Sequence, residues 1–399
     1  MGRSSLHLQV PTGVRDILPG EAKRKRQMES SFVDMFEQWG YQEVVTPTFE
    51  YFDALARGDN SGAWDQLYRF FDRDGRILAL RPDITTPIAR MVATRLRGNI
   101  LPLRLFYLGN VFRYESPQAG RQREFTQAGV ELIGARSAAA DAEVITLAVR
   151  ALENSGLDDF QIGVGQVEVF HGLMEEAELD EDTRRQVRES VASKDLVGLE
   201  ECLERSGVPA SLREVLLSLP SLHGGVEVLD RAMGMTDNKR ALRGLTNLSR
   251  VFSALAAAGV GDRVIMDLGV LRGFDYYTGM VFEGYAPGLG FPVCGGGRYD
   301  QLLGKFGHPL PATGFAIGIE RLMLAVGSLE QQAVGPDFLV AGKDHVAVSK
   351  KAQSLREQGF SAEVDLLDRT AEELIAYARE RGIKSLIIKT GGDWMKLEA

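Results

Sequence analysis

The segment Leu103–Gly134, LRLFYLGNVFRYESPQAGRQREFTQAGVELIG, decides the fold because it holds two strand-like runs on either side of a turn. The first run is Leu103–Glu115 and the second is Arg123–Gly134. The connection between them, SPQAGRQ, is rich in residue types that form turns. This pattern predicts an antiparallel hairpin.

One face of this hairpin is predicted to be polar. Successive side chains of a strand point to opposite faces, so Arg113 and Glu115 share a face of the first run, and Gln127 and Glu131 share one of the second. Burying such groups is costly unless they satisfy each other or a ligand, which makes this face a candidate binding site. A solvated sheet face with ion pairs is the alternative. If the two polar faces coincide, they bring together Arg113, Glu115, Phe125, Gln127 and Glu131, with Gly129 leaving space between them.

A second candidate is the stretch Leu268–Gly279, LGVLRGFDYYTG, which places an arginine, an aspartate and two tyrosines in an apolar run. An extended conformation would put Arg272 and Tyr276 on one face and Tyr277 on the other. Arginine offers five fixed donors to a carboxylate or phosphate, and a tyrosine hydroxyl can close a pocket from the side. The stretch therefore predicts a site for a small polar ligand, with a structural strand as the alternative.

A third candidate lies at the start of a helix. A predicted β-hairpin at Tyr68–Leu80 leads into the sequence RPDITTP, which ends at Pro87. Apolar residues recur at helical spacing after this proline, so Asp83 and Thr85 lie at the helix entrance. Both residue types are frequent helix caps, and capping is the alternative to a role in a site.

The composition is that of a globular protein with ample core. The chain has 399 residues, of which 44% are hydrophobic and 25% charged, and its length suggests two or three domains. No run of about 18 apolar residues and no apolar leader occurs, so we expect a cytoplasmic location. Two distant cysteines and five scattered histidines favour neither a disulfide nor a metal site. A net charge of −9 argues mildly against nucleic-acid binding through broad electrostatics.

The order of the predicted elements indicates three parts. Residues 1–170 and 260–327 form a core with most of the strand signals, and residues 171–259 form an inserted helical domain. Residues 335–399 form a small α/β unit that ends after about three strands, because strand and helix patterns alternate there.

Two further stretches of the core are less specific. The glycine-rich run Gly295–Asp300 lacks the strand, loop and helix order of a Walker or Rossmann motif, so we expect no phosphate-loop ATPase chemistry. In Ala312–Leu322, a strand of small residues leads into a helix. Its Arg321 either meets an anion or pairs with an acidic neighbour.

Four stretches taken together resemble the catalytic core of histidyl-tRNA synthetase, a class II aminoacyl-tRNA synthetase. The RGxDYY element is specific to the histidine branch, and the resemblance extends from about residue 8 to 325. The stretches are LRPDITTPIAR at Leu80–Arg90, VFRYESPQAGRQREFTQAGVELIG at Val111–Gly134, VLRGFDYYTG at Val270–Gly279, and GGGRYDQLLGKFG with ATGFAIGIERL at Gly295–Leu322.

The resemblance implies an α+β fold with a class II synthetase-like antiparallel sheet of six or more strands flanked by helices. A helical insertion and a small truncated α/β C-terminal domain would complete the chain, which would dimerise around the first motif. A histidine pocket would lie beside an ATP pocket. Carried over by position, the histidine pocket would use Asp83, Thr85, Arg113, Gln127, Glu131, Arg272, Tyr276 and Tyr277, and the vestigial ATP positions would be Arg113, Phe125 and Arg321.

Three departures from the synthetase pattern affect ATP and tRNA use more than amino-acid binding. The usual LRPEGT reads LRPDIT here, so Asp83 is shorter by a methylene and Ile84 replaces a glycine that leaves room beside the ligand. The usual RPQ loses its cation at Ser116. The C-terminal domain is shorter than the anticodon-binding domain of the family.

This combination is similar to HisZ, the paralogous family of ATP phosphoribosyltransferase regulatory subunits. The resemblance implies a non-catalytic, non-aminoacylating subunit that needs no cofactor or metal and binds neither tRNA nor membrane. Its partner would be the short-form catalytic subunit HisG, with a homodimer of this chain inside a hetero-octamer. L-histidine would be the regulatory ligand for feedback inhibition of the first step of histidine biosynthesis. A divergent histidyl-tRNA synthetase that charges tRNA with histidine is the alternative.

Overall fold

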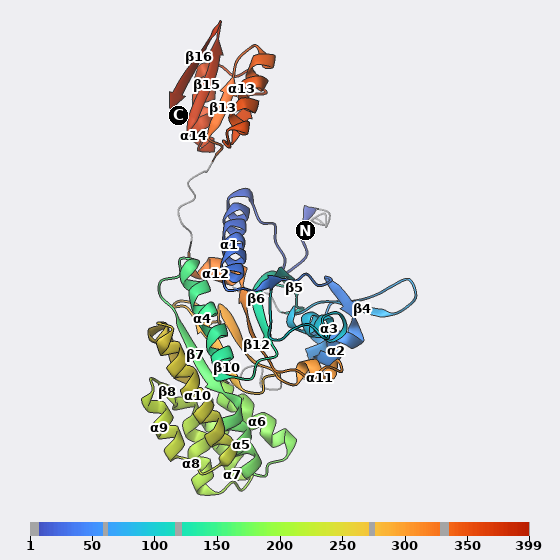
Figure 1. Cartoon of the computed structure of the whole chain (residues 1–399), viewed down its shortest axis with the longest axis vertical. Coiled ribbons are helices and arrows are strands. Elements are labelled where there is room, and N and C mark those ends of the chain that lie inside the picture. The colour runs from blue at the N-terminus through green and yellow to red at the C-terminus, as the bar shows by residue number, and fades with distance from the viewer. Residues whose placement is uncertain (1–7, 59–62, 116–121, 271–275, 328–334, 399) are drawn as a thin grey trace, which may run out of the picture. The chain divides into compact units, whose positions relative to one another are not determined.

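The computed structural model describes residues 8–58, 63–115, 122–270, 276–327 and 335–398. The chain divides into two compact units, and Figure 1 shows both. The first unit comprises Met1–Asp16 and Lys25–Gly327, and the second comprises Ile17–Arg24 and Ser328–Ala399.

In the described part of the first unit, nine strands form one sheet in the order β1-β5-β6-β12-β11-β10-β7-β9-β8. Every neighbouring pair from β5 to β7 in this order is antiparallel, and the outer pairs β1·β5 and β7·β9 are parallel. This confirms the predicted antiparallel sheet of six or more strands. The strands are β1 Gln42–Glu43, β5 Leu103–Phe112, β6 Glu124–Ile133, β7 Gln161–Gln166, β8 His223–Gly224, β9 Val264–Asp267, β10 Met280–Tyr285, β11 Cys294–Arg298 and β12 Ala312–Gly318.

The predicted hairpin is the pair β5·β6. Its strands are antiparallel, and Val111 lies opposite Phe125. Because residues opposite each other point to the same face, the predicted polar faces of the two runs coincide. Backbone pairing continues past the end of β5, where the Arg113 N–H donates to the Arg123 carbonyl over 2.9 Å.

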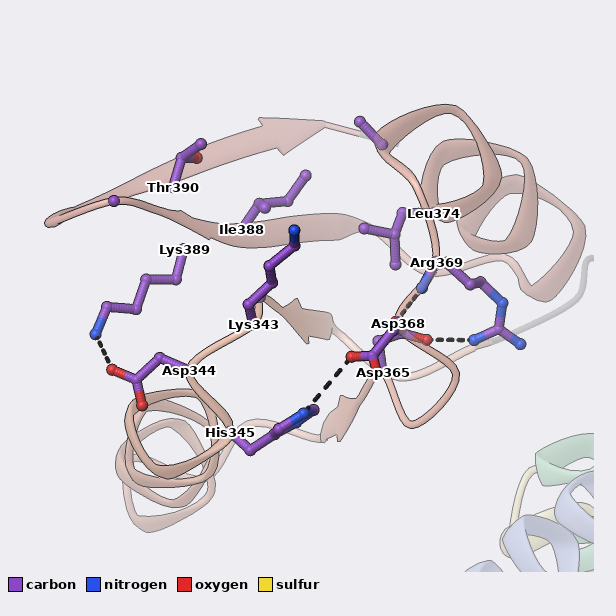
Figure 2. A pocket seen from close by; sticks show the side chains of 13 residues that line it. Lys343, Asp344, His345, Asp365, Asp368, Arg369, Leu374, Ile388, Lys389 and Thr390 are labelled. Carbon is purple, nitrogen blue, oxygen red and sulfur yellow. Dashed lines mark hydrogen bonds and ion pairs between the residues drawn. The ribbon is translucent and has the colours of Figure 1, made fainter.

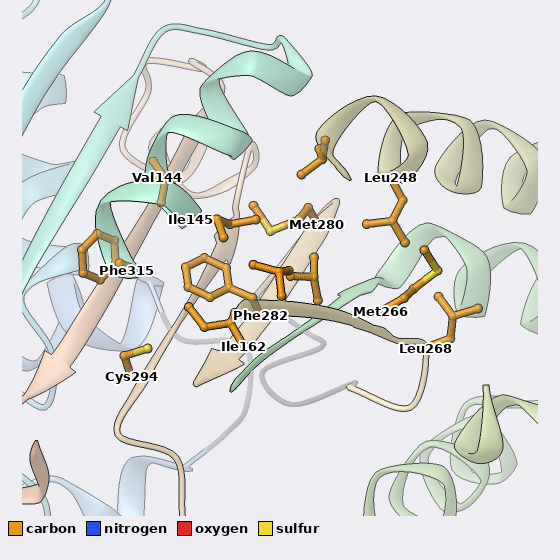
Figure 3. Packing of buried hydrophobic residues seen from close by; sticks show 14 of the residues in the cluster. Val144, Ile145, Ile162, Leu248, Met266, Leu268, Met280, Phe282, Cys294 and Phe315 are labelled. Atoms are coloured by element: carbon orange, nitrogen blue, oxygen red, sulfur yellow. The ribbon is translucent and has the colours of Figure 1, made fainter. Parts of the chain in front are cut away.

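One face of the sheet is apolar and packed against helices. Phe106 of β5, Phe282 of β10 and Phe315 of β12 point to this face and are buried. Figure 3 shows Phe282 and Phe315 near Ile145 of the covering helix. Alternation along each strand therefore supplies the core from every second residue. The helices against this face are α1 Pro19–Gln38, α4 Ala138–Asn154, α10 Lys239–Ala257 and α12 Ile319–Ala325.

The opposite face of the central strands carries very small residues. The strand registers align glycines of β5, β6, β11 and β12 on this face. The glycine-rich run is therefore a central strand, β11, and forms no phosphate loop. We call this surface the glycine floor, defined by Gly109, Gly129, Gly295, Gly297, Gly314 and Gly318.

A smaller sheet in the order β2-β4-β3 lies in the same unit. Its strands β3 and β4 form the hairpin predicted at Tyr68–Leu80. The following helix begins at Thr85, two residues before Pro87. The elements of this region are β2 Phe49–Tyr51, α2 Phe52–Gly58, the 3-10 helix η2 Ala63–Gln66, β3 Arg69–Phe71, β4 Ile77–Leu80, α3 Thr85–Arg95 and α11 Leu302–Lys305.

The segment predicted as an inserted domain is helical, apart from the two-residue strand β8. It lies in the same compact unit as the sheet, and its independence as a domain stays a prediction. Its first helix begins at Val167, four residues before the predicted boundary at residue 171. The further elements are α5 Val167–Glu176, α6 Glu181–Ser193, α7 Leu196–Arg205, α8 Ala210–Ser218, η3 Leu219–Ser221, α9 Glu227–Gly234 and η4 Gly261–Arg263.

The second unit is an α/β sheet in the order β14-β13-β15-β16. The expected end after about three strands is wrong, because β16 pairs antiparallel with β15. The alternation of apolar and polar residues does not predict β16, because its residues are mostly exposed and its apolar Trp394 and Met395 are adjacent. The elements are β13 Phe338–Ala341, α13 His345–Glu357, β14 Ala362–Val364, α14 Ala371–Arg381, β15 Ser385–Thr390 and β16 Asp393–Glu398.

Candidate functional site

Glu131 of β6 lies at the centre of the candidate site and is only 1% exposed. It lies opposite Gly314 of β12 across the sheet. A Cβ atom at this glycine would clash with Oε2 of Glu131, so the glycine floor provides the space that the carboxyl group occupies.

Hydroxyl groups surround this carboxyl group. The Tyr299 hydroxyl donates a hydrogen bond to Glu131, and hydrogen bonds also link Thr85 to Glu131 and to Tyr107. Burial is the largest effect on the pKa of Glu131 and raises it to about 8, although the hydrogen bonds from Tyr299 and Thr85 act to lower it. The carboxyl group is therefore mostly protonated at neutral pH.

Two buried polar atoms of the candidate residues that the structure describes lack a partner, one beside Glu131 and one four residues away from it along β6. Within the described residues, neither Oε1 of Gln127 nor the Tyr276 hydroxyl has a hydrogen-bond partner. Burial raises the pKa of Tyr276 well above its usual range, and the charges of Glu131 and Asp83 raise it further. An unpaired buried polar atom costs about 1–3 kcal/mol, so these groups favour a ligand that would pair with them.

The stretch Leu268–Gly279 is not the predicted strand where the structure describes it. Leu268–Val270 and Tyr276–Gly279 lie outside strands. Tyr276 and Tyr277 therefore do not alternate: their rings are in contact, with centroids 5.1 Å apart, and both pack against one apolar cluster. Arg272, the predicted anion-binding residue, lies outside the described residues.

Asp83 caps the helix that follows it. Its Oδ1 accepts a hydrogen bond of 2.8 Å from the Thr86 N–H, so the capping role considered from the sequence is present. Its charge also acts on Glu131 and Tyr276, which places it beside the same cluster. The neighbouring Ile84 is only 2% exposed and packs into the core beside Gly109.

Arg113, Phe125 and Arg321 form a second group. The Arg113 guanidinium lies over the Phe125 ring at 5.3 Å, and that of Arg321 lies at 6.0 Å from the same ring. Arg113 also donates to the Pro82 carbonyl over 2.9 Å. The structure thus brings together the positions that the resemblance assigns to ATP, at the end of β6 away from Glu131.

Two tyrosines of the cluster were missed from the sequence. Tyr107 lies opposite Gly129, and a Cβ atom there would come within about 2.5 Å of the Tyr107 hydroxyl. The parity rule applied to Arg113 also selects Tyr107, six residues earlier on the same face. Tyr299 follows the glycine-rich run, and treating that run as a strand would have placed it beside Gly297.

No group of three or more His, Cys, Asp or Glu side chains is arranged for a metal ion within the ranges that the structure describes. In those ranges no helix has the length and apolar composition to cross a membrane.

Comparisons with known proteins agree on one family. A family model described as histidyl-tRNA synthetase matches residues 13–322. A protein of Moorella thermoacetica named ATP phosphoribosyltransferase regulatory subunit is 50% identical over 380 residues, which cover 95% of this chain and 98% of that protein.

Solved structures share the fold over nearly the whole chain. A Bacillus halodurans protein described as an ATP phosphoribosyltransferase regulatory subunit/histidyl-tRNA synthetase has a TM-score of 0.85 at 33% identity, covering 96% of this chain and 99% of its own. Histidyl-tRNA synthetase from Nostoc sp. PCC 7120 has a TM-score of 0.82 at 22% identity, covering 98% of this chain and 96% of its own. Length therefore does not separate this chain from that synthetase, and the expected shortness of the C-terminal domain is no argument against the synthetase alternative.

Proposed function

The chain belongs to the histidyl-tRNA synthetase family and, within it, to the ATP phosphoribosyltransferase regulatory subunits, and from this premise we propose that it is a non-catalytic subunit of that enzyme. Its partner is the short-form catalytic subunit, which condenses ATP with phosphoribosyl pyrophosphate in the first step of histidine biosynthesis. The subunit is required for activity and conveys feedback inhibition by histidine. The proposal includes a cytoplasmic location.

The observation that carries the ligand assignment is the buried cluster around Glu131. The ammonium group of histidine would lie beside the carboxyl groups of Glu131 and Asp83, where a cation favours the ionised form of both. Gln127 Oε1 and the Tyr276 hydroxyl would pair with its remaining polar atoms. We assign the carboxylate of histidine to Arg272. Thr85 and Tyr277 shape the same site, and Arg113 borders it at Pro82.

Regulation follows from a difference in affinity between two states of the complex. Histidine can favour the inhibited arrangement only to the extent that it binds that arrangement more tightly. Ionisation of Glu131 beside the ammonium group adds one negative charge to a buried site. We propose that the surrounding tyrosines rearrange around this charge and that the catalytic subunit senses the new arrangement.

The alternative is a divergent histidyl-tRNA synthetase. The pair of arginines on Phe125 favours it, because cations and an aromatic ring suit phosphates and adenine. Ile84 opposes it, since a buried branched side chain stands where the synthetase pattern has glycine. Histidine-dependent exchange of pyrophosphate into ATP by the pure chain would establish this alternative and refute the regulatory proposal.

The direct test mixes this chain with a short-form catalytic subunit and measures the condensation of ATP with phosphoribosyl pyrophosphate. We expect the chain to raise the rate and histidine to reduce it again. Glu131→Gln should retain the activation and lose the inhibition by histidine. Equal inhibition by histidine of the mixtures with the wild-type chain and with Glu131→Gln would show that histidine acts at another site.

We also propose that the chain forms a homodimer within a hetero-octamer. Phe49, Tyr51 and Phe70 lie on one face of the β2-β4-β3 sheet and are 52%, 49% and 39% exposed. A contiguous apolar face of this kind is typical of an interface, and a second copy of this chain is the proposed occupant. Analytical ultracentrifugation should show a dimer for the wild type and a monomer for Phe49→Glu.

A further inference from the structure

The second unit contains a cavity of about 690 Å³ that the proposed function does not use. It lies at the carboxyl ends of β13, β14 and β15, among residues that follow β13 and β14, the last residues of β15 and the start of α14. Figure 2 shows its lining side chains, which include Lys343, His345, Asp365, Arg369, Ile388 and Lys389.

The topology of the second unit explains why a cavity forms here. β13 is flanked by β14 on one side and by β15 on the other, and both pairs are parallel. α13 packs with one apolar cluster of this unit and α14 with another. From β13 the chain crosses through α13 to β14 on one side, and from β14 it crosses through α14 to β15 on the other side of β13. Open α/β sheets bind ligands in the crevice where the strand order reverses in this way.

Two of the three acidic groups of the cavity are engaged by cations. Asp344 forms an ion pair of 2.6 Å with Lys389 and accepts a 3.1 Å hydrogen bond from the Ala347 N–H. Asp365 accepts a 2.5 Å hydrogen bond from Arg369, whose guanidinium stacks 4.0 Å above Tyr377. A ligand would therefore meet two neutralised carboxylates, the carboxylate of Asp368 with His345 3.6 Å away, and an arginine that is not free for bidentate pairing.

Lys343 is the exception among the cations of the cavity. It is exposed and has no hydrogen-bond or ion-pair partner among the residues that the structure describes. Figure 2 shows its ammonium group extending into the cavity toward the space between Ile388 and Leu374. The lining charges otherwise nearly cancel, and the N-termini of α13 and α14 add positive potential.

We propose that this cavity binds a phosphomonoester, with Lys343 holding the phosphate and Ile388 and Leu374 contacting the body of the ligand. A lone ammonium beside helix N-termini suits the compact charge of a phosphate, whereas a planar carboxylate prefers the fork of a free arginine. The volume lies within the range of small-molecule sites. The proposal is independent of the histidine site in the first unit.

The test measures binding to the full-length chain by calorimetry with adenosine 5′-monophosphate, ribose 5-phosphate and adenosine. We expect a phosphate ester to bind and adenosine not to bind. Tighter binding of adenosine 5′-monophosphate than of ribose 5-phosphate identifies a nucleotide site. Equal binding of these two esters identifies a sugar-phosphate site.

Two lysine variants locate the binding. Lys343→Gln should weaken it at least ten-fold, while Lys350→Gln, an exposed lysine on α13 outside the cavity lining, should leave it unchanged. Histidine binding by both variants reports that the first unit is folded, and an unchanged circular dichroism spectrum reports the same of the second unit. Absence of binding by either ester, or equal affinity in the Lys343 variant, would overturn the proposal.

Discussion

Replacing Glu131 by glutamine should make the ligand-free protein more stable while removing the histidine site. The carboxyl group is buried and its pKa is raised to about 8, so the native state holds its proton more tightly than the unfolded chain, where the pKa is 4.5. As pH rises from 4.5 to 8, the unfolded state loses this proton first. The free energy of unfolding therefore falls over this interval and levels off above it.

The expected magnitude follows from these two values. Each pH unit between them costs about 1.4 kcal/mol, and the loss between pH 5 and pH 8 is on the order of 3 kcal/mol when partial ionisation at both ends is included. Glutamine has no proton to exchange, so this part of the pH dependence should vanish in Glu131→Gln. The variant should be more stable than the wild type at pH 8 by a larger margin than at pH 5.

Urea unfolding of both proteins at pH 5 and pH 8 measures this difference. Other titrating groups cancel when the two profiles are subtracted. Gln127→Ala is the matched control, because it alters a neutral neighbour on the same face of β6 and should leave the pH profile parallel to that of the wild type. Parallel profiles for the wild type and Glu131→Gln would refute the reasoning.

Three further outcomes are expected. Histidine should bind more tightly as pH rises toward 8 and should release a proton on binding below that pH, because the ammonium group lowers the pKa of Glu131; calorimetry in buffers of different ionisation enthalpy checks this. Tyr276→Phe removes an unpaired buried hydroxyl, so the ligand-free protein should keep or gain about 1 kcal/mol of stability while histidine binding weakens roughly ten-fold in a titration. Gly314→Ala should lower the free energy of unfolding by about 1–3 kcal/mol, because the added methyl group meets Glu131; thermal unfolding would contradict this if the melting temperature stayed the same.

The parts of the site that follow strand alternation could be predicted from the sequence. Arg113, Phe125, Gln127 and Glu131 were grouped by parity, and the register of Val111 opposite Phe125 supports that grouping. Parity works here because both runs are regular strands whose opposite face is buried. The histidine assignment itself came from the motif resemblance, and its residues remain a proposal.

Other parts could not be predicted because their conformation is not periodic. Tyr276 and Tyr277 reach the same cluster from a segment outside the strands, so the alternation assumed for them does not apply. β16 exists through its pairing with β15, and its own exposed residues carry no strand pattern. The sequence offered helix capping and a place in the site as alternatives for Asp83. In the structure one carboxylate does the first and also lies beside the cluster, so the choice between the two could not be made.

The glycine floor restricts how this site can evolve. Because a Cβ atom at Gly129, Gly297 or Gly314 would collide with a tyrosine, a glutamate or the backbone, every substitution there adds bulk where none fits. Point mutation of these three glycines therefore fills space that the site needs and does not enlarge the site. A new ligand preference must arise from other side chains of the site, such as Gln127 and Tyr276. A regulatory subunit could in this way alter its response to a ligand while the glycine floor stays unchanged.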